Sequence, residues 1–183
     1  MKIQIKSIVV CTCCLLLITA SCKKAKTGID GLPAATQEGK NTIGCMVNGV
    51  LFKPKGSATG GPIVQSYYQL DNGNYLFLVA ARRRGNNRTL GVQIETLGIE
   101  LQTGMTIPLV ERSMGKARGW YIDYGGGEFK DYQTNPQIKG ELKITRFDLT
   151  NQIVSGTFWF DAVDDKGLKV EVREGRFDMN FAR

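Results

Sequence analysis

The sequence predicts an all-β fold, a single antiparallel β-sandwich of about ten strands. Apolar residues alternate with polar ones over many short runs, as they do in strands that bury one face. Turns of two to five residues separate several of these runs, and such short turns cannot join parallel strands. The 183-residue chain also has 22 glycines and only 5 prolines, with Val, Ile, Thr, Phe and Tyr filling the runs. An up-and-down, lipocalin-like barrel is the alternative, because it would share this periodicity.

Residues 1–21 have the pattern of a lipoprotein signal peptide. Lys2 and Lys6 give a positively charged start, and an apolar or small run of 13 residues follows at 8–20. A helix that crosses a bilayer needs roughly 20 apolar residues, so this run is too short to be one. Three cysteines lie inside the run, where free cysteine behaves as a small hydrophobe: Cys11, Cys13 and Cys14.

Cys22 is the candidate lipidation site. The residues L-I-T-A-S-C that end at Cys22 resemble the lipobox of a bacterial lipoprotein, although Thr19 replaces the usual leucine. The resemblance implies that Cys22 is acylated and that the preceding peptide is removed; an ordinary secretory signal cut nearby is the alternative. Two or three acyl chains hold a protein stably on a membrane, at about 0.8 kcal/mol per buried methylene. The expected location is therefore the cell envelope, with the protein anchored to the outer membrane.

Residues 22–40 are predicted to form a flexible tether between the anchor and the domain. The stretch KKAKTGIDGLPAATQEG is small and polar and shows no apolar periodicity. No acidic residue follows Cys22 closely, and in the lipoproteins that it resembles this favours the periplasmic face over the cell surface. The tether also carries several of the lysines behind the net charge of +7, which makes a nucleic-acid partner unattractive.

The predicted β domain covers residues 41–183 and begins with a hairpin. Asn48 and Gly49 stand between two apolar runs, which is the strongest short-range signal for a two-residue turn. Such a turn places Cys45 opposite Phe52. The period-2 rule then puts five residues on one face: Ile43, Cys45, Val47, Val50 and Phe52. Cys45 is therefore expected in the core, and a chain that starts at Cys22 has no other cysteine with which to form an internal disulfide.

Further strands are predicted through the middle of the domain. Turn residues at 71–74 and 84–88 separate the runs 63–70, 75–82 and 89–95, and further runs follow at 105–110, 118–124 and 128–134. The stretch 94–104 could hold a single helical turn. Alternation within 118–124 puts Trp120, Ile122 and Tyr124 on one face, which is equally consistent with a core face.

The last 45 residues are the most regular part of the sequence. Turns at 149–152 and 164–167 separate runs in which apolar and polar residues alternate, so an antiparallel meander is predicted. The apolar positions expected in the core are Leu142, Ile144, Phe158, Phe160, Leu168, Val170, Val172, Phe177, Met179 and Phe181.

Four strings of the domain resemble a family of uncharacterised Bacteroidota lipoproteins. They are N-T-I-G-C-M-V-N-G, G-E-L-K-I-T-R-F-D, I-V-S-G-T-F-W-F-D-A and G-R-F-D, and the resemblance covers roughly residues 41–183. It implies an envelope location and a β-rich domain. It implies no catalytic residue, because the family carries no assigned activity.

Two groups of residues are candidate binding sites. Arg82, Arg83, Arg84 and Arg88 crowd one hairpin tip, where their guanidinium groups could bind phosphate, sulfate or uronic-acid groups. The alternative is a solvated loop that protects a sheet edge. Trp120, Tyr121 and Tyr124 could stack on sugar rings, and a place in the core is the alternative.

No cofactor or metal site is predicted. The chain has no histidine, which excludes serine-histidine triads and zinc-histidine sites. Asp161, Asp164 and Asp165 do not match the spacing of a calcium loop, and a plain turn explains them. The sequence thus favours a lipid-anchored, non-catalytic domain for ligand binding or structural interaction. A carbohydrate-binding accessory lipoprotein and a hydrolase that uses carboxylates are the alternatives.

Overall fold

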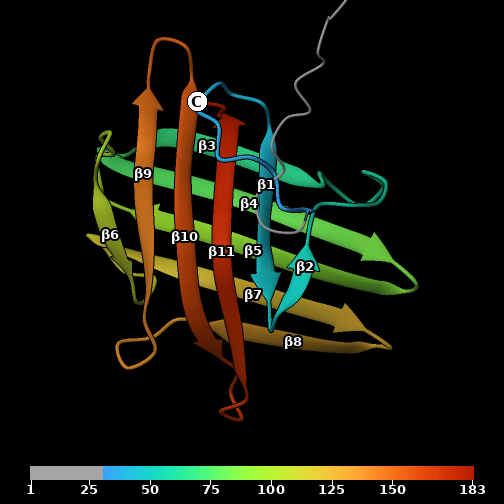
Figure 1. Ribbon diagram of the computed structural model, residues 1–183. Coiled ribbons are helices and arrows are strands. Elements are labelled where there is room, and N and C mark those ends of the chain that lie inside the picture. The colour runs from blue at the N-terminus through green and yellow to red at the C-terminus, as the bar shows by residue number, and fades with distance from the viewer. Residues whose placement is uncertain (1–30) are drawn as a thin grey trace, which may run out of the picture.

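The computed structural model describes residues 31–183, which form eleven β-strands (Figure 1). The signal peptide, the lipidation site Cys22 and the first part of the predicted tether lie outside the described residues. The strands are β1 (Thr42–Val47), β2 (Val50–Phe52), β3 (Val64–Asp71), β4 (Asn74–Gly85), β5 (Arg88–Leu97), β6 (Thr106–Leu109), β7 (Lys116–Gly125), β8 (Glu128–Gln133), β9 (Gly140–Asp148), β10 (Ile153–Val163) and β11 (Lys169–Asn180).

All eleven strands belong to one hydrogen-bonded sheet that is folded into two layers. The strand order is β2-β1-β11-β10-β9-β6-β7-β5-β4-β3, with β8 paired to β7 and touching β10. Every strand pair is antiparallel except β6 with β7. In Figure 1 the strands β9, β10, β11 and β1 form a front layer, and β3, β4, β5, β7 and β8 run across behind it. The prediction of an all-β, antiparallel domain of about ten strands is confirmed.

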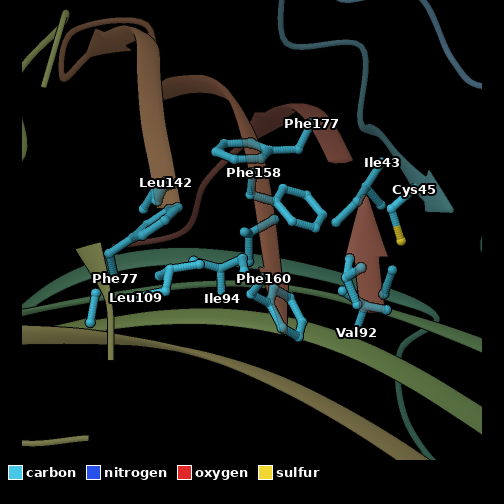
Figure 2. Close-up of a cluster of buried hydrophobic side chains, with 14 of the residues drawn as sticks. Ile43, Cys45, Phe77, Val92, Ile94, Leu109, Leu142, Phe158, Phe160 and Phe177 are labelled. Carbon is cyan, nitrogen blue, oxygen red and sulfur yellow. The ribbon is translucent and has the colours of Figure 1, made fainter. Parts of the chain in front are cut away.

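The core lies between the two layers. Figure 2 shows Phe158, Phe160 and Phe177 from the front layer facing Ile94 and Val92 from the rear layer. The predicted core positions of the carboxy-terminal meander are buried, as the alternation requires. Leu168 is the exception at 55% exposure, because it belongs to the turn before β11 and does not yet follow the alternation of that strand.

The first hairpin has the predicted register. Cys45 pairs with Phe52 across the Asn48–Gly49 turn, and both side chains are buried. Burial disfavours the thiolate, so the pKa of Cys45 is raised well above its ordinary value. Val50, expected on the same buried face, is instead 66% exposed, since it directly follows the exposed Asn48–Gly49 turn.

Trp120, Ile122 and Tyr124 share one face of β7, as predicted. This face does not point into the core, so the interpretation of the three residues as core residues is wrong. Tyr121 and Ala117 point into the core, so Trp120, Ile122 and Tyr124 lie on the outer face of the rear layer. Gly119 explains which side chains of β7 point inward. A Cβ at that position would lie 2.6 Å from the Phe160 ring. Because side chains alternate strictly along a strand, the close approach of Phe160 at Gly119 determines which face every neighbour takes.

Residues 32–40, predicted as part of the tether 22–40, instead pack against the front layer; we call them the strap. Leu32 is fully buried, and Pro33 lies over Gly44, where a Cβ would be 2.7 Å from the proline ring. Gly44 alternates with inward-facing Ile43 and Cys45, so the strap covers the outer face of the layer. In Figure 1 this segment is the blue chain that crosses β11. The predicted domain boundary at residue 41 is thus about ten residues too late.

A buried carboxylate fastens the strap to the sheet. Asp178 of β11 is 1% exposed and accepts hydrogen bonds from the Thr36 hydroxyl at 2.5 Å and the Ser155 hydroxyl at 2.8 Å. The backbone N–H groups of Glu38 and Gly39 also donate to it, at 3.0 and 2.7 Å. Burial by itself raises the pKa of a carboxyl group, but these donors stabilise the ionised form and lower the pKa of Asp178 to about 2.

We expect the free energy of unfolding to fall as Asp178 becomes protonated. The folded pKa lies below the ordinary value, so the stabilisation is present above about pH 4 and is lost as the pH falls toward 2, by about 2 kcal/mol. Asp178→Asn should lower the stability at pH 7 by roughly 2–4 kcal/mol and remove most of this acid dependence. Urea unfolding between pH 2 and 7 measures both effects. Asp165→Asn, in an exposed turn, is the control; equal acid dependence in Asp178→Asn and wild type would contradict the prediction.

Candidate functional site

A groove opens on the outer face of the front layer, beside the strap; we call it the Trp159 groove. Its volume is about 480 Å³, within the range of small-molecule sites. Strands β9, β10 and β11 form its floor, and the strap contributes one wall through Ala35. The polar and aromatic residues that line it are Glu141, Thr157, Phe158, Trp159, Arg173, Glu174 and Arg176.

Trp159 points outward because its neighbours point inward. Phe158 and Phe160 are both buried in the core, so the alternation of β10 directs the indole between them to the outer face. Trp159 is 42% exposed. Glu141 of β9 stands directly opposite it in register, which places the two Cβ atoms roughly 5 Å apart. An aromatic ring and a carboxylate therefore share the floor of the groove.

A β-bulge shapes the other side of the groove. The register between β10 and β11 shifts between Phe158 and Phe160, and Glu174 takes the left-handed conformation with φ at 53°. That conformation costs a residue other than glycine of order 1 kcal/mol. At Gly175 a Cβ would collide with the Phe158 ring, so only glycine fits there. Bulges redirect side chains, and this one spreads Arg173 and Glu174 along the groove.

The charges of the groove are partly neutralised. The Arg173 guanidinium lies 5.6 Å from the centroid of the Trp159 ring and pairs with Asp161 at 2.5 Å. Arg176 pairs with Glu174 at 3.5 Å. Glu141 makes no ion pair with any residue in 31–183. The groove therefore combines a flat aromatic surface with one carboxylate that is free to accept hydrogen bonds from a ligand.

The four predicted arginines do not form one site. Arg84 donates to four backbone carbonyls of the loop 57–61, at 2.7 to 3.0 Å. Arg82 donates to a carbonyl of the same loop region and Arg83 to the Leu51 carbonyl at 3.1 Å. Alternation puts Arg83 on the opposite face from its two neighbours. Arg88 forms a bidentate ion pair with Asp123. These guanidinium groups serve mainly to hold loops and strands in place.

The predicted aromatic triplet is also divided. Tyr121 lies in the core, whereas Trp120 donates its indole N–H to Asp131 and lies under Arg118, at 5.1 Å from ring centroid to guanidinium. Tyr124 is exposed at the end of β7. Trp159 was not among the predicted site residues. Its outward position could have been found from the alternation of Phe158 and Phe160 on either side of it.

Asp164 stabilises the last turn, whereas Asp161 pairs with residues of the neighbouring strand β11. Asp164 accepts hydrogen bonds from the backbone N–H groups of Lys166 and Leu168, at 3.0 and 2.7 Å. Asp161 pairs with Lys169 at 2.9 Å in addition to Arg173. Across residues 31–183 no three Cys, Asp or Glu side chains are grouped so that they could hold a metal ion.

Comparison with protein-family models, with curated proteins and with solved structures finds no match for this chain. Within the part of the chain that the structure describes, no helix is long and apolar enough to span a membrane.

We expect Glu174→Gly to raise the free energy of unfolding by about 1 kcal/mol, because glycine adopts the left-handed conformation without a steric penalty. The ion pair with Arg176 that is lost contributes little, because it is long, at 3.5 Å, and the Glu174 side chain is half exposed. Glu174→Val, which removes the same carboxylate but cannot relieve the backbone, should be less stable than wild type. Urea unfolding of both variants measures the difference, and equal stability of the two would refute the strain at this position.

Proposed function

We propose that this protein is a lipid-anchored component of the cell envelope whose β domain binds a ligand in the Trp159 groove and performs no chemistry of its own. The main support for ligand binding is the half-exposed indole of Trp159, which lies on the floor of the groove beside a strained bulge. Bulges and strained residues cluster at functional sites. Large exposed aromatic side chains likewise tend to mark surfaces that meet a ligand or partner.

The envelope part of the proposal is supported by the amino-terminal sequence. A positively charged start, a short apolar run and a cysteine after small residues are together typical of a lipoprotein signal. The acylated Cys22 would hold the protein in the outer membrane, and the periplasmic face is the proposed side. No cofactor or nucleic-acid partner is proposed.

Cys22→Ala should abolish the incorporation of labelled palmitate, because the acceptor of the acyl chains is lost. Cys45→Ala, which changes the buried cysteine, should leave incorporation unchanged and serves as the control. Gel fluorography of cells grown with the labelled fatty acid measures both. Undiminished labelling of Cys22→Ala would refute the anchor.

A hydrolase is the second candidate function, and one specific observation supports it. Glu141 and Glu174 both line the groove, on β9 and β11, either side of the strand that carries Trp159. Two strand spacings separate their backbones by roughly 10 Å, a distance from which the side chains could reach the roughly 6.5–9.5 Å between carboxyl groups that inverting glycosidases use. Binding is preferred because Glu174 is half exposed and engaged with Arg176, whereas a general acid needs an apolar setting. The release of hydrolysis products from a bound glycan would support the hydrolase.

A ligand of the groove should raise the melting temperature of the protein in a screen of glycans, lipids and ions. A ligand present at 100 times its Kd adds about 2.7 kcal/mol to the free energy of unfolding. Trp159→Ala should abolish this stabilisation. Phe129→Ala, which removes an exposed aromatic side chain from the rear layer, should retain it. Full stabilisation of Trp159→Ala by every active ligand would place binding elsewhere.

A further inference from the structure

The charges and the ring that line the Trp159 groove identify a class of ligand. We propose that the groove binds an uncharged saccharide, with a sugar ring stacked on Trp159 and neighbouring hydroxyls held by Glu141. This inference rests on the binding function proposed above and adds to it the chemistry of the ligand.

The stacking surface follows from the strand order. β10 lies between β9 and β11, and Arg173 of β11 occupies one side of the Trp159 ring. The side turned away from Arg173 lies toward β9, where Glu141 stands directly opposite in register. The C–H groups on one side of a pyranose ring form a flat apolar surface that packs on an aromatic ring. The open part of the indole offers such a contact.

The hydrogen-bonding partner follows from the free carboxylate. An ionised carboxylate only accepts hydrogen bonds, and its two oxygens can receive two hydroxyl donors at once. Adjacent hydroxyls of a sugar ring supply such a pair of donors. Glu141 has no ion pair among residues 31–183 that would compete for these oxygens, and the Thr157 hydroxyl also lines the groove.

The charge balance excludes the acidic sugars that the arginine-rich hairpin first suggested. Arg173 is paired with Asp161 and Glu171, at 2.5 and 3.8 Å, and Arg176 is paired with Glu174. The uncompensated charge of the groove is therefore the negative charge of Glu141. A uronic acid would meet repulsion there, whereas a neutral sugar would meet an acceptor.

Isothermal titration calorimetry of the purified protein against matched hexasaccharides tests the inference. The probes are neutral hexamers of glucose, mannose, galactose and xylose, with hexagalacturonate as the anionic counterpart. At least one neutral hexamer should bind about tenfold more tightly than hexagalacturonate. Glu141→Gln should weaken the neutral hexamer about tenfold and bring the two affinities together, because the amide accepts fewer hydroxyl bonds and carries no charge. Glu100→Gln, an exposed glutamate outside the groove, should change neither affinity.

Hexagalacturonate that binds as tightly as every neutral hexamer would overturn the inference. So would a failure of all hexamers to bind while another class of ligand shows stabilisation that depends on Trp159; the proposed binding function would then stand. If Trp159→Ala changes the response to no ligand at all, both proposals fall.

Discussion

The carboxylate of Asp178 is the interaction on which the outer face of the front layer depends. It lies on the side of β11 away from the core, where a carboxylate would ordinarily face water, yet the strap covers it almost completely. Burying a charge is costly unless hydrogen bonds compensate for it, and here hydroxyl and backbone donors from both the strap and the sheet do so. Strap and sheet thus stabilise each other, and the wall of the Trp159 groove follows from that contact.

The parts of the fold that local sequence determines could be predicted. The Asn48–Gly49 hairpin and the meander of β9, β10 and β11 arise from turn residues and alternation within one stretch of chain. The packing of the strap and the face of β7 that points into the core could not be predicted in this way. They depend on contacts between distant residues, such as Thr36 with Asp178 and Gly119 with Phe160, and a periodic pattern carries no information about them.

The candidate sites show the same limit for side chains. A crowd of arginines in the sequence indicates a high local charge, but not which backbone carbonyls lie within reach of each guanidinium. In the fold, Arg84 supplies hydrogen bonds that the turns of loop 57–61 lack from their own backbone. Trp159 shows the converse. It stands alone between two phenylalanines in the sequence, and only the neighbouring strands and the bulge give it the partners of a binding site.

If Cys22 is acylated as proposed, the strap also determines how far the domain can stand from the membrane. With acylation at Cys22, residues 23–31 would separate the lipid from Leu32, which is buried in the domain. Nine residues reach about 30 Å at full extension, against about 60 Å for the 17 residues that the sequence alone would have left unattached. The domain would then work in a thin layer next to the bilayer, because Leu32 could stand no farther than about 30 Å from the lipid. Molecules in that layer would be within its reach, and those farther from the bilayer would have to come to it.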